Sequence, residues 1–367
     1  MGDTGPFRGT IALESAKPAG KDATMKALVL REYMDLVYED VPRPEIAEGE
    51  VLVKVEACGI CGSDVHGLDG STGRRQPPLI MGHEASGVVA ETGPAVTGWT
   101  RGDRVTFDST IYRLDDWYTR RGLYNLSDGR MVLGVSPGEY RRHGAFAEYV
   151  AVPQHILYRV PPAVSFEQAA MVEPVAVAAH AVGLTPVAVG DTAVVVGAGM
   201  IGLCLVQVLR AAGCGRVLAV DLEPEKLELA GRLGADAVLD PGKDDVAKEV
   251  ARATEGRGAD VAFEAVGITA TVKTAIAAVR RGGTVTLVGN LAPSVEVPLQ
   301  AVVTRQLRLQ GSCAIAGEYP AALAMIERGA VDVDAMRSAV APLSEGAAWF
   351  DRLYQKERGL MKVILKP

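Results

Sequence analysis

The sequence predicts an α/β protein of two domains, in which a mainly antiparallel β domain precedes a doubly wound parallel sheet. Three observations carry this prediction. A chain of 367 residues exceeds what one core usually supports. Short alternating apolar segments fill its first part, whereas after Pro174 strands rich in Ala, Val and Gly alternate with helical patterns. A glycine-rich turn also joins the first of those strands to a helix.

The first domain begins at the strand-like segment that starts with Met25, and helical patterns are scarce in it. Segments such as Glu50 to Val55 and Gly87 to Ala90 are bounded by turn residues, as expected of antiparallel strands. Residues 1–24 are polar and lack the continuous apolar core of a signal peptide. We therefore expect them to form an N-terminal tail.

Five buried strands are predicted in the second part, with helices between them: Thr192–Val196, Arg216–Asp221, Ala237–Asp240, Asp260–Glu264 and Gly283–Val288. The run from Thr192 to Leu209 has no charged residue and is about as long as a membrane span. Its glycines lie where a strand must turn into a helix, so we interpret the run as a buried strand and helix rather than a membrane segment.

Composition narrows the class of function. The net charge is −7, and no Lys/Arg run exceeds two residues, so a nucleic-acid surface is not expected. A content of 48% hydrophobic and 23% charged residues is ordinary for a globular protein. Five cysteines, an odd number without disulfide-like spacing, favour a reducing compartment, and we expect a cytoplasmic location. Small-molecule chemistry is the expected activity.

A dinucleotide site is predicted at Gly197-Ala198-Gly199-Met200-Ile201-Gly202. The motif follows an apolar strand and opens a helix, and Asp221 ends the next strand about 20 residues later. Gly197 permits the tight turn, Gly199 lets the backbone reach the pyrophosphate, and Gly202 allows close packing of the helix. The Asp221 carboxylate accepts hydrogen bonds from ribose hydroxyls and repels a 2′-phosphate, which predicts NAD as the cofactor.

Two later strands are expected to end at the same edge of the sheet. Val266 and Val288 lie at these strand ends, each followed by a glycine. Because ligands bind outside the carboxyl ends of parallel strands, both residues are candidates for contact with the cofactor.

A metal site is predicted from two segments of the first domain. Cys61 lies in Gly59-Ile60-Cys61-Gly62-Ser63-Asp64, and His83 and Glu84 follow Gly82 a little further along the chain. A thiolate, an imidazole and a carboxylate brought together by folding form a site that leaves room for a substrate oxygen. Catalytic rather than structural zinc is held in this way.

The pattern GHEASGVVAETGPAV resembles the signature of the zinc-containing medium-chain alcohol and polyol dehydrogenases. The likeness extends from Met25 to Pro367, and the order of GICGSDVH, MGHEASG and VEPVAVAAH is most similar to the sorbitol and polyol dehydrogenase branch. The resemblance implies a GroES-like catalytic domain, residues 25–175 and 313–367, and an NAD-binding Rossmann domain, residues 176–312. It also implies a homo-oligomer, a dimer or a tetramer.

The resemblance also assigns roles to individual residues. Cys61 and His83 are implied as zinc ligands, and Glu84 and Glu173 are implied to share the role of the carboxylate ligand. Direct binding by either glutamate, binding through water, and alternation between the two all stay open. Asp64 is expected to orient a ligand such as His83.

A proton path is implied next to these ligands. Ser63 and His66 stand at the spacing of the family's relay, in which the serine hydroxyl takes the alcohol proton and the histidine passes it, with the ribose between, to water.

Lys226 is expected beside the adenosine ribose, although the wet face of an amphipathic helix is an equally good explanation for it.

The chain departs from its resembling family at two places. Most relatives hold a structural zinc on four cysteines, but here that frame falls on Arg113, Asp116, Thr119 and Ser127, which cannot replace four thiolates. We therefore expect one catalytic zinc per subunit and no structural zinc. Small apolar residues in Gly311–Pro320 also replace the Arg-Tyr pair of sorbitol dehydrogenases, so a sorbitol assignment is unsafe.

The leading interpretation is an NAD-linked, zinc-dependent dehydrogenase that oxidises a secondary alcohol of a polyol, cyclitol or sugar-like small molecule to a ketone. One alternative is an acyclic diol or amino-alcohol dehydrogenase, of the butanediol or threonine type. Another is a non-catalytic dinucleotide-binding protein, which would not need Cys61, Ser63, His66, His83 and Glu173 together.

Overall fold

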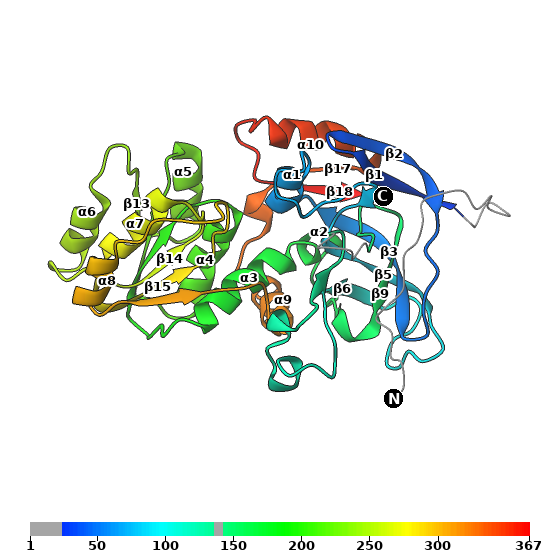
Figure 1. The fold of residues 1–367 in the computed structure, drawn as a ribbon, viewed down its shortest axis with the longest axis horizontal. Helices are drawn as coiled ribbons and strands as arrows, with labels where there is room; N and C mark the ends of the chain where they lie inside the picture. The colour runs from blue at the N-terminus through cyan, green and yellow to red at the C-terminus, as the bar shows by residue number, and fades with distance from the viewer. Residues whose placement is uncertain (1–23, 136–141) are drawn as a thin grey trace. The chain divides into compact units, whose positions relative to one another are not determined.

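The structure is a computed structural model that describes residues 24–135 and 142–367, so the expected tail lies outside the described residues except for Thr24. The chain divides into two compact units. Unit 1 holds the described residues up to Met171 together with Arg337–Pro367, and unit 2 is Val172–Met336. Figure 1 shows both units along the chain.

Unit 1 is mainly β structure. Its strands and helices, in chain order, are β1 (Thr24–Glu32), β2 (Asp35–Pro42), β3 (Glu50–Gly59), α1 (Gly62–Gly67), β4 (Leu79–Ile80), β5 (Glu84–Thr92), β6 (Arg104–Phe107), β7 (Thr110–Ile111), β8 (Met131–Val132), β9 (Tyr149–Pro153), β10 (Leu157–Arg159), α2 (Phe166–Ala169), β17 (Arg337–Pro342), α10 (Gly346–Tyr354) and β18 (Lys362–Lys366).

One sheet organises this unit, with the strand order β10-β6-β5-β3-β18-β17 and with β9 also paired to β3 (Figure 1). All of its pairs are antiparallel except β17 with β18. Alternate residues of β3 are fully buried, among them Val51, Val53 and Val55, and pack with Phe107 and Phe146 in one core. The antiparallel character expected from the alternating segments is confirmed.

Unit 2 contains α3 (Val172–Gly183), β11 (Thr192–Val196), α4 (Met200–Ala211), β12 (Arg216–Val220), α5 (Pro224–Arg232), β13 (Ala237–Leu239), α6 (Val246–Ala253), β14 (Ala259–Glu264), α7 (Thr269–Ala278), β15 (Val279–Leu287), α8 (Leu299–Thr304), β16 (Arg308–Gly311) and α9 (Tyr319–Glu327). Its six strands are parallel in the order β13-β12-β11-β14-β15-β16. All five residues of β11 are buried, because helices cover both faces of the sheet.

The parallel sheet predicted from the sequence is confirmed, and the structure adds β16 as its edge strand. The first predicted strand, Thr192–Val196, matches β11 in both bounds. Among the described residues, no helix is long and apolar enough to cross a membrane.

The division between the two compact units lies at a different residue from the expected domain boundary. The expected domain boundary lay at residues 312 and 313, whereas the units divide between Met336 and Arg337. Helix α9 packs against α3, and Glu318 just before it accepts a hydrogen bond from His180 of α3 at 2.8 Å. The amide of Asp332 also donates to Gln207 of α4 at 2.7 Å. These contacts hold residues 313–336 in unit 2.

A lobe of unit 1 covers the region where the resemblance would place a structural zinc. The Asp116 carboxylate lies inside it, accepting hydrogen bonds from the amides of Tyr118 at 2.8 Å, Thr119 at 3.0 Å and Asp128 at 3.1 Å. Burial opposes the charge of this carboxylate, but the backbone donors outweigh burial and lower its pKa. A carboxylate thus ties together the two ends of the lobe.

We predict that Asp116→Ala loosens this lobe. Three amides lose their acceptor, so hydrogen exchange at Tyr118, Thr119 and Asp128 should accelerate while exchange in β3 and β5 stays unchanged. Since the folded pKa is lowered, the stabilisation is present above the ordinary pKa of an aspartate and is lost as the pH falls through the folded value. Hydrogen exchange read by mass spectrometry measures the effect.

The matched control is Asp115→Ala, because Asp115 is exposed and its side chain pairs with the exposed Arg113. Equal exchange in both variants would contradict the role of Asp116.

Candidate metal centre

Strand register brings the predicted metal ligands together. At the end of β3, Gly59 is paired with Glu84, the first residue of β5, on one side and with Ile364 of β18 on the other. The chain then turns at Ile60 and begins α1, with Cys61 as the residue that precedes the helix. His83 stands immediately before β5. Two sheet pairs therefore fix Cys61 beside His83 and Glu84.

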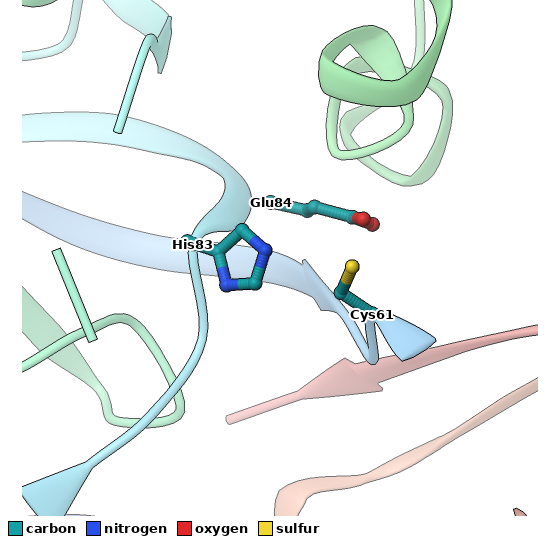
Figure 2. A group of neighbouring side chains, drawn as sticks. All are labelled: Cys61, His83 and Glu84. Atoms are coloured by element: carbon teal, nitrogen blue, oxygen red, sulfur yellow. The ribbon is translucent and has the colours of Figure 1, made fainter. Parts of the chain in front are cut away.

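Cys61, His83 and Glu84 form a compact group, with one ligand atom from each lying within 4.8 Å of the others. Figure 2 shows the three side chains turned toward one another. A thiolate sulfur, an imidazole nitrogen and a carboxylate oxygen are the donors that zinc prefers. His83 and Glu84 are buried, whereas Cys61 is partly open to solvent, so the donor set fits a zinc ion with one accessible side.

Asp64 lies behind His83. Its Oδ1 atom is 3.4 Å from His83 Nδ1, and its Oδ2 accepts from the amide of Cys61 at 3.4 Å. Burial alone would raise the pKa of Asp64, but the charges of His83 and Arg75 hold it well below its ordinary value. An ionised Asp64 that faces Nδ1 would leave Nε2 of His83 to serve as the metal ligand, as in other carboxylate-histidine pairs.

Glu84 also has a cationic partner. Lys362 Nζ, at the start of β18, donates to Glu84 Oε2 at 2.5 Å and to the carbonyl of Ile60 at 3.1 Å. Both side chains are almost completely buried, with 3% and 1% exposed. Removing one member of such a pair leaves an uncompensated buried charge. The ion pair therefore fixes one carboxylate oxygen of Glu84.

The predicted proton path lies on α1. Ser63 Oγ donates to Cys61 Sγ at 3.4 Å and accepts from Arg75 Nη2 at 3.1 Å. His66 follows three residues later, where a helix places a side chain on the same face. Both residues are exposed.

Glu173, the other candidate carboxylate, lies in the first turn of α3 and belongs to unit 2. The Cys61 group lies within unit 1. Its part in metal binding stays a prediction. His180 of the same helix is buried and pairs with Glu318.

In unit 2 the glycine-rich segment forms the turn between β11 and α4. Gly197 has φ of 100°, a left-handed value, and a Cβ on Gly202 would lie 1.7 Å from the Gly197 carbonyl oxygen. Among the described residues, nothing beyond Gly199 and its two chain neighbours lies within 4 Å of a Cβ built on Gly199, so the backbone is open there. Met200 and Ile201 begin α4. The segment has the shape that a pyrophosphate site requires.

The predicted specificity residue, Asp221, reaches this turn. Its Oδ2 accepts from the amide of Ala198 at 2.7 Å, and its Oδ1 accepts from the amide of Glu223 at 3.0 Å. Lys226, expected near the ribose, pairs with Glu223 at 2.7 Å on the surface of α5. Its position fits either explanation given above.

Val266 and Val288 follow β14 and β15 at the same edge of the sheet. The Val266 amide donates to the buried Glu264 side chain at 3.0 Å, and the Val288 amide donates to the Glu264 carbonyl at 2.8 Å. Glu264 thus holds both strand ends in place.

Sequence reasoning missed two cations, Arg75 and Lys362. Arg75 belongs to a double arginine that resembles a solvated pair, and only the fold shows that it is 2% exposed. Lys362 begins the run Lys-Val-Ile-Leu-Lys of an apolar strand. The sequence signal for a buried cation was therefore a lysine at the start of an apolar strand.

Comparison with known proteins identifies both units. Residues 47–162 match the alcohol dehydrogenase GroES-like domain, and residues 201–328 match the zinc-binding dehydrogenase family. Sorbitol dehydrogenase of Bacillus subtilis (strain 168) is 33% identical over 348 residues, which cover 94% of this chain and 97% of that protein. (R,R)-Butanediol dehydrogenase of the same organism is 33% identical over 355 residues, which cover 94% and 100%.

A solved structure agrees with these sequence matches. A Sinorhizobium meliloti 1021 protein, crystallised with NADP bound, has a TM-score of 0.86 and 33% identity, covering 94% of this chain and 99% of that one. Likeness of this extent, in sequence and in fold, shows that the chain belongs to the zinc-binding medium-chain dehydrogenase family and is an enzyme of its alcohol and polyol dehydrogenase type.

Proposed function

We propose that the enzyme transfers a hydride between NAD and a secondary alcohol of a polyol, cyclitol or sugar-like substrate, yielding a ketone. The observation that carries this proposal is the grouping of Cys61, His83 and Glu84 within 4.8 Å. Cys61 and His83 would hold the zinc ion, and Glu84 or Glu173 would supply a carboxylate ligand. A zinc ion bound there supplies Lewis acidity, which lowers the pKa of an alcohol hydroxyl.

The chain's own residues orient the substrate and move its proton. The Ser63 hydroxyl takes the proton of the alcohol while it releases its own toward His66, and His66 passes a proton on to water. A path of this kind is necessary because the proton must leave a site with little water. The placement of Ser63 beside Cys61, with His66 one helical turn further along, supports these roles.

The substrate class rests on the relatives and on the segment Gly311–Pro320. One relative is named for sorbitol and another for butanediol, so both a polyol and an acyclic diol have support. In this segment the Glu318 carboxylate is held by His180 and by the amide of Ala316 at 2.6 Å. The Glu318 carboxylate therefore stabilises the fold of unit 2. The small residues around it offer no charged side chain to a substrate, which favours a substrate that does not need one at this segment.

A panel of polyols, cyclitols, diols and amino-alcohols, assayed with NAD by the absorbance of the reduced cofactor, tests the proposal. Turnover of a cyclic or long-chain polyol above the diols supports the leading assignment. Preference for butanediol or threonine would establish the alternative.

The first expected outcome concerns the cofactor. NAD should give a higher kcat/KM than NADP, because Asp221 stands at the turn where a 2′-phosphate would meet like charge. The double variant Asp221→Ser with Leu222→Arg should move the ratio toward NADP by about tenfold or more, equivalent to roughly 1.4 kcal/mol.

Glu225→Ser is the matched control, since it removes an exposed acid from the same segment. One relative was crystallised with NADP, so the comparison is informative. A preference for NADP in the unmodified enzyme would refute the assignment of Asp221.

The second outcome concerns the metal. Elemental analysis should find about one zinc per chain. In the lobe where a second zinc would be expected, Asp116 accepts hydrogen bonds from backbone amides, and the four thiolates of a structural zinc site are replaced. Cys61→Ser or His83→Ala should lose that zinc and all turnover while still binding NAD, whose loop is in unit 2. Glu84→Gln and Glu173→Gln, compared for zinc affinity, separate the two carboxylates. A count of about two zinc atoms per chain would overturn the single-site proposal.

The third outcome concerns the proton path. His66→Ala should reduce kcat less than loss of a metal ligand does, roughly a hundredfold at low pH and less at high pH, where bulk bases replace the imidazole. Small added bases such as imidazole should restore part of the rate. A pH profile identical to that of the unmodified enzyme would remove His66 from the path.

We also propose a homo-oligomer, a dimer or a tetramer. Leu299 and Val303 of α8 are 69% and 68% exposed, and β16 is the edge strand of its sheet. Exposed apolar side chains beside a strand edge favour association. The cytoplasmic location stays an expectation from the cysteine count.

A further inference from the structure

Arg75 is an unusual charged residue in unit 1, because its side chain is among the largest fully buried ones, with 2% exposed. Taking an arginine out of water costs several kcal/mol unless partners compensate for it. Within residues 24–135 and 142–367, its Nε has no hydrogen-bond partner. All of its hydrogen bonds there come from Nη2, which donates to Asp64 Oδ1 at 2.6 Å and to Ser63 Oγ at 3.1 Å.

The two partners of Arg75 each contact a different candidate metal ligand. Asp64 Oδ1, which accepts from Arg75, is also 3.4 Å from His83 Nδ1. Ser63 Oγ, which also accepts from Arg75, lies 3.4 Å from Cys61 Sγ. Nη2 of Arg75 is thus connected through one intervening side chain to the imidazole of His83 and through another to the sulfur of Cys61.

The fold makes room for Arg75 in a specific way. The arginine lies in the loop between α1 and β4, and its stem passes over the last residue of α1. A Cβ built on Gly67 would lie 2.6 Å from Arg75 Cγ and 3.4 Å from its Cβ. Gly67 therefore permits the close approach that lets the guanidinium reach Ser63 and Asp64.

We infer that Arg75 is a positioning residue of the metal centre, which holds Ser63 and Asp64 so that Cys61 and His83 keep the geometry for zinc. This inference rests on the proposed function, since it assumes that zinc binds there. Partners behind the ligands of a metal typically account for 10- to 100-fold in affinity. An ion pair with only a structural role would stabilise the fold and leave zinc affinity unchanged.

The test measures zinc affinity by competition with a chelator, together with the absorption spectrum of the Co²⁺-substituted protein, which reports ligand geometry without turnover. Arg75→Met should weaken zinc binding about 10- to 100-fold and shift the cobalt bands. Arg75→Lys keeps the charge on a shorter side chain that cannot bind both partners equally. Its zinc affinity should therefore lie between those of the unmodified protein and Arg75→Met. Arg74→Met is the matched control, because Arg74 is the exposed neighbour, and it should change neither readout.

Gly67→Ala provides a second route, since it displaces the stem of Arg75 without removing its charge; it should weaken zinc binding in the same direction. If Arg75→Met does not fold, Arg75→Lys and Gly67→Ala carry the test. Unchanged zinc affinity and cobalt spectra in the folded variants overturn the inference, even if their thermal stability falls. Failure of the unmodified protein to take up zinc would instead refute the proposed function.

Discussion

The register of β3 between β5 and β18 is the constraint on which the site depends. Gly59 is paired with Glu84 on one side and with Ile364 on the other, so three distant segments of the chain end at one point. A shift of one residue would turn every side chain of a strand to the opposite face. Cys61, His83 and Glu84 would then no longer meet, and Lys362 would no longer reach Glu84. The buried valines of β3 stabilise this register, so the hydrophobic core of unit 1 also holds the metal centre together.

Two buried ion pairs flank the ligand group. The pair of Arg75 and Asp64 lies behind His83. The pair of Lys362 and Glu84 joins the start of β18 to the start of β5. Buried pairs of this kind rarely add net stability, because desolvation offsets the attraction between the charges. Their placement indicates that electrostatic order around Cys61 and His83 is maintained at a cost to the fold. Each pair combines a residue of a recognisable motif with a cation from outside any motif.

That division also explains how much the sequence alone could predict. The glycine-rich turn, Asp221 and the parallel strands follow from local spacing and periodicity, so they could be predicted, as could the roles proposed for Cys61 and His83. Arg75 could not, because no local pattern says which arginine of a pair the fold will bury, and Lys362 had only its place at the start of an apolar strand as a signal. The division between Met336 and Arg337 also could not be predicted, since the packing of α9 on α3 is a tertiary contact that leaves no periodic signal.

The position of β18 also sets the order in which the enzyme becomes complete. Glu84 and Lys362 are 278 residues apart, and all of unit 2 is made between them. During synthesis, unit 2 has every strand of its sheet before the ribosome reaches the segment that closes unit 1. Until then Glu84 lacks its buried counter-charge, and Cys58 and Gly59 at the end of β3 lack their partners in β18. The nascent chain therefore has every strand of its dinucleotide unit before it has a complete metal centre, and the unpaired end of β3 is a place for a chaperone to cover.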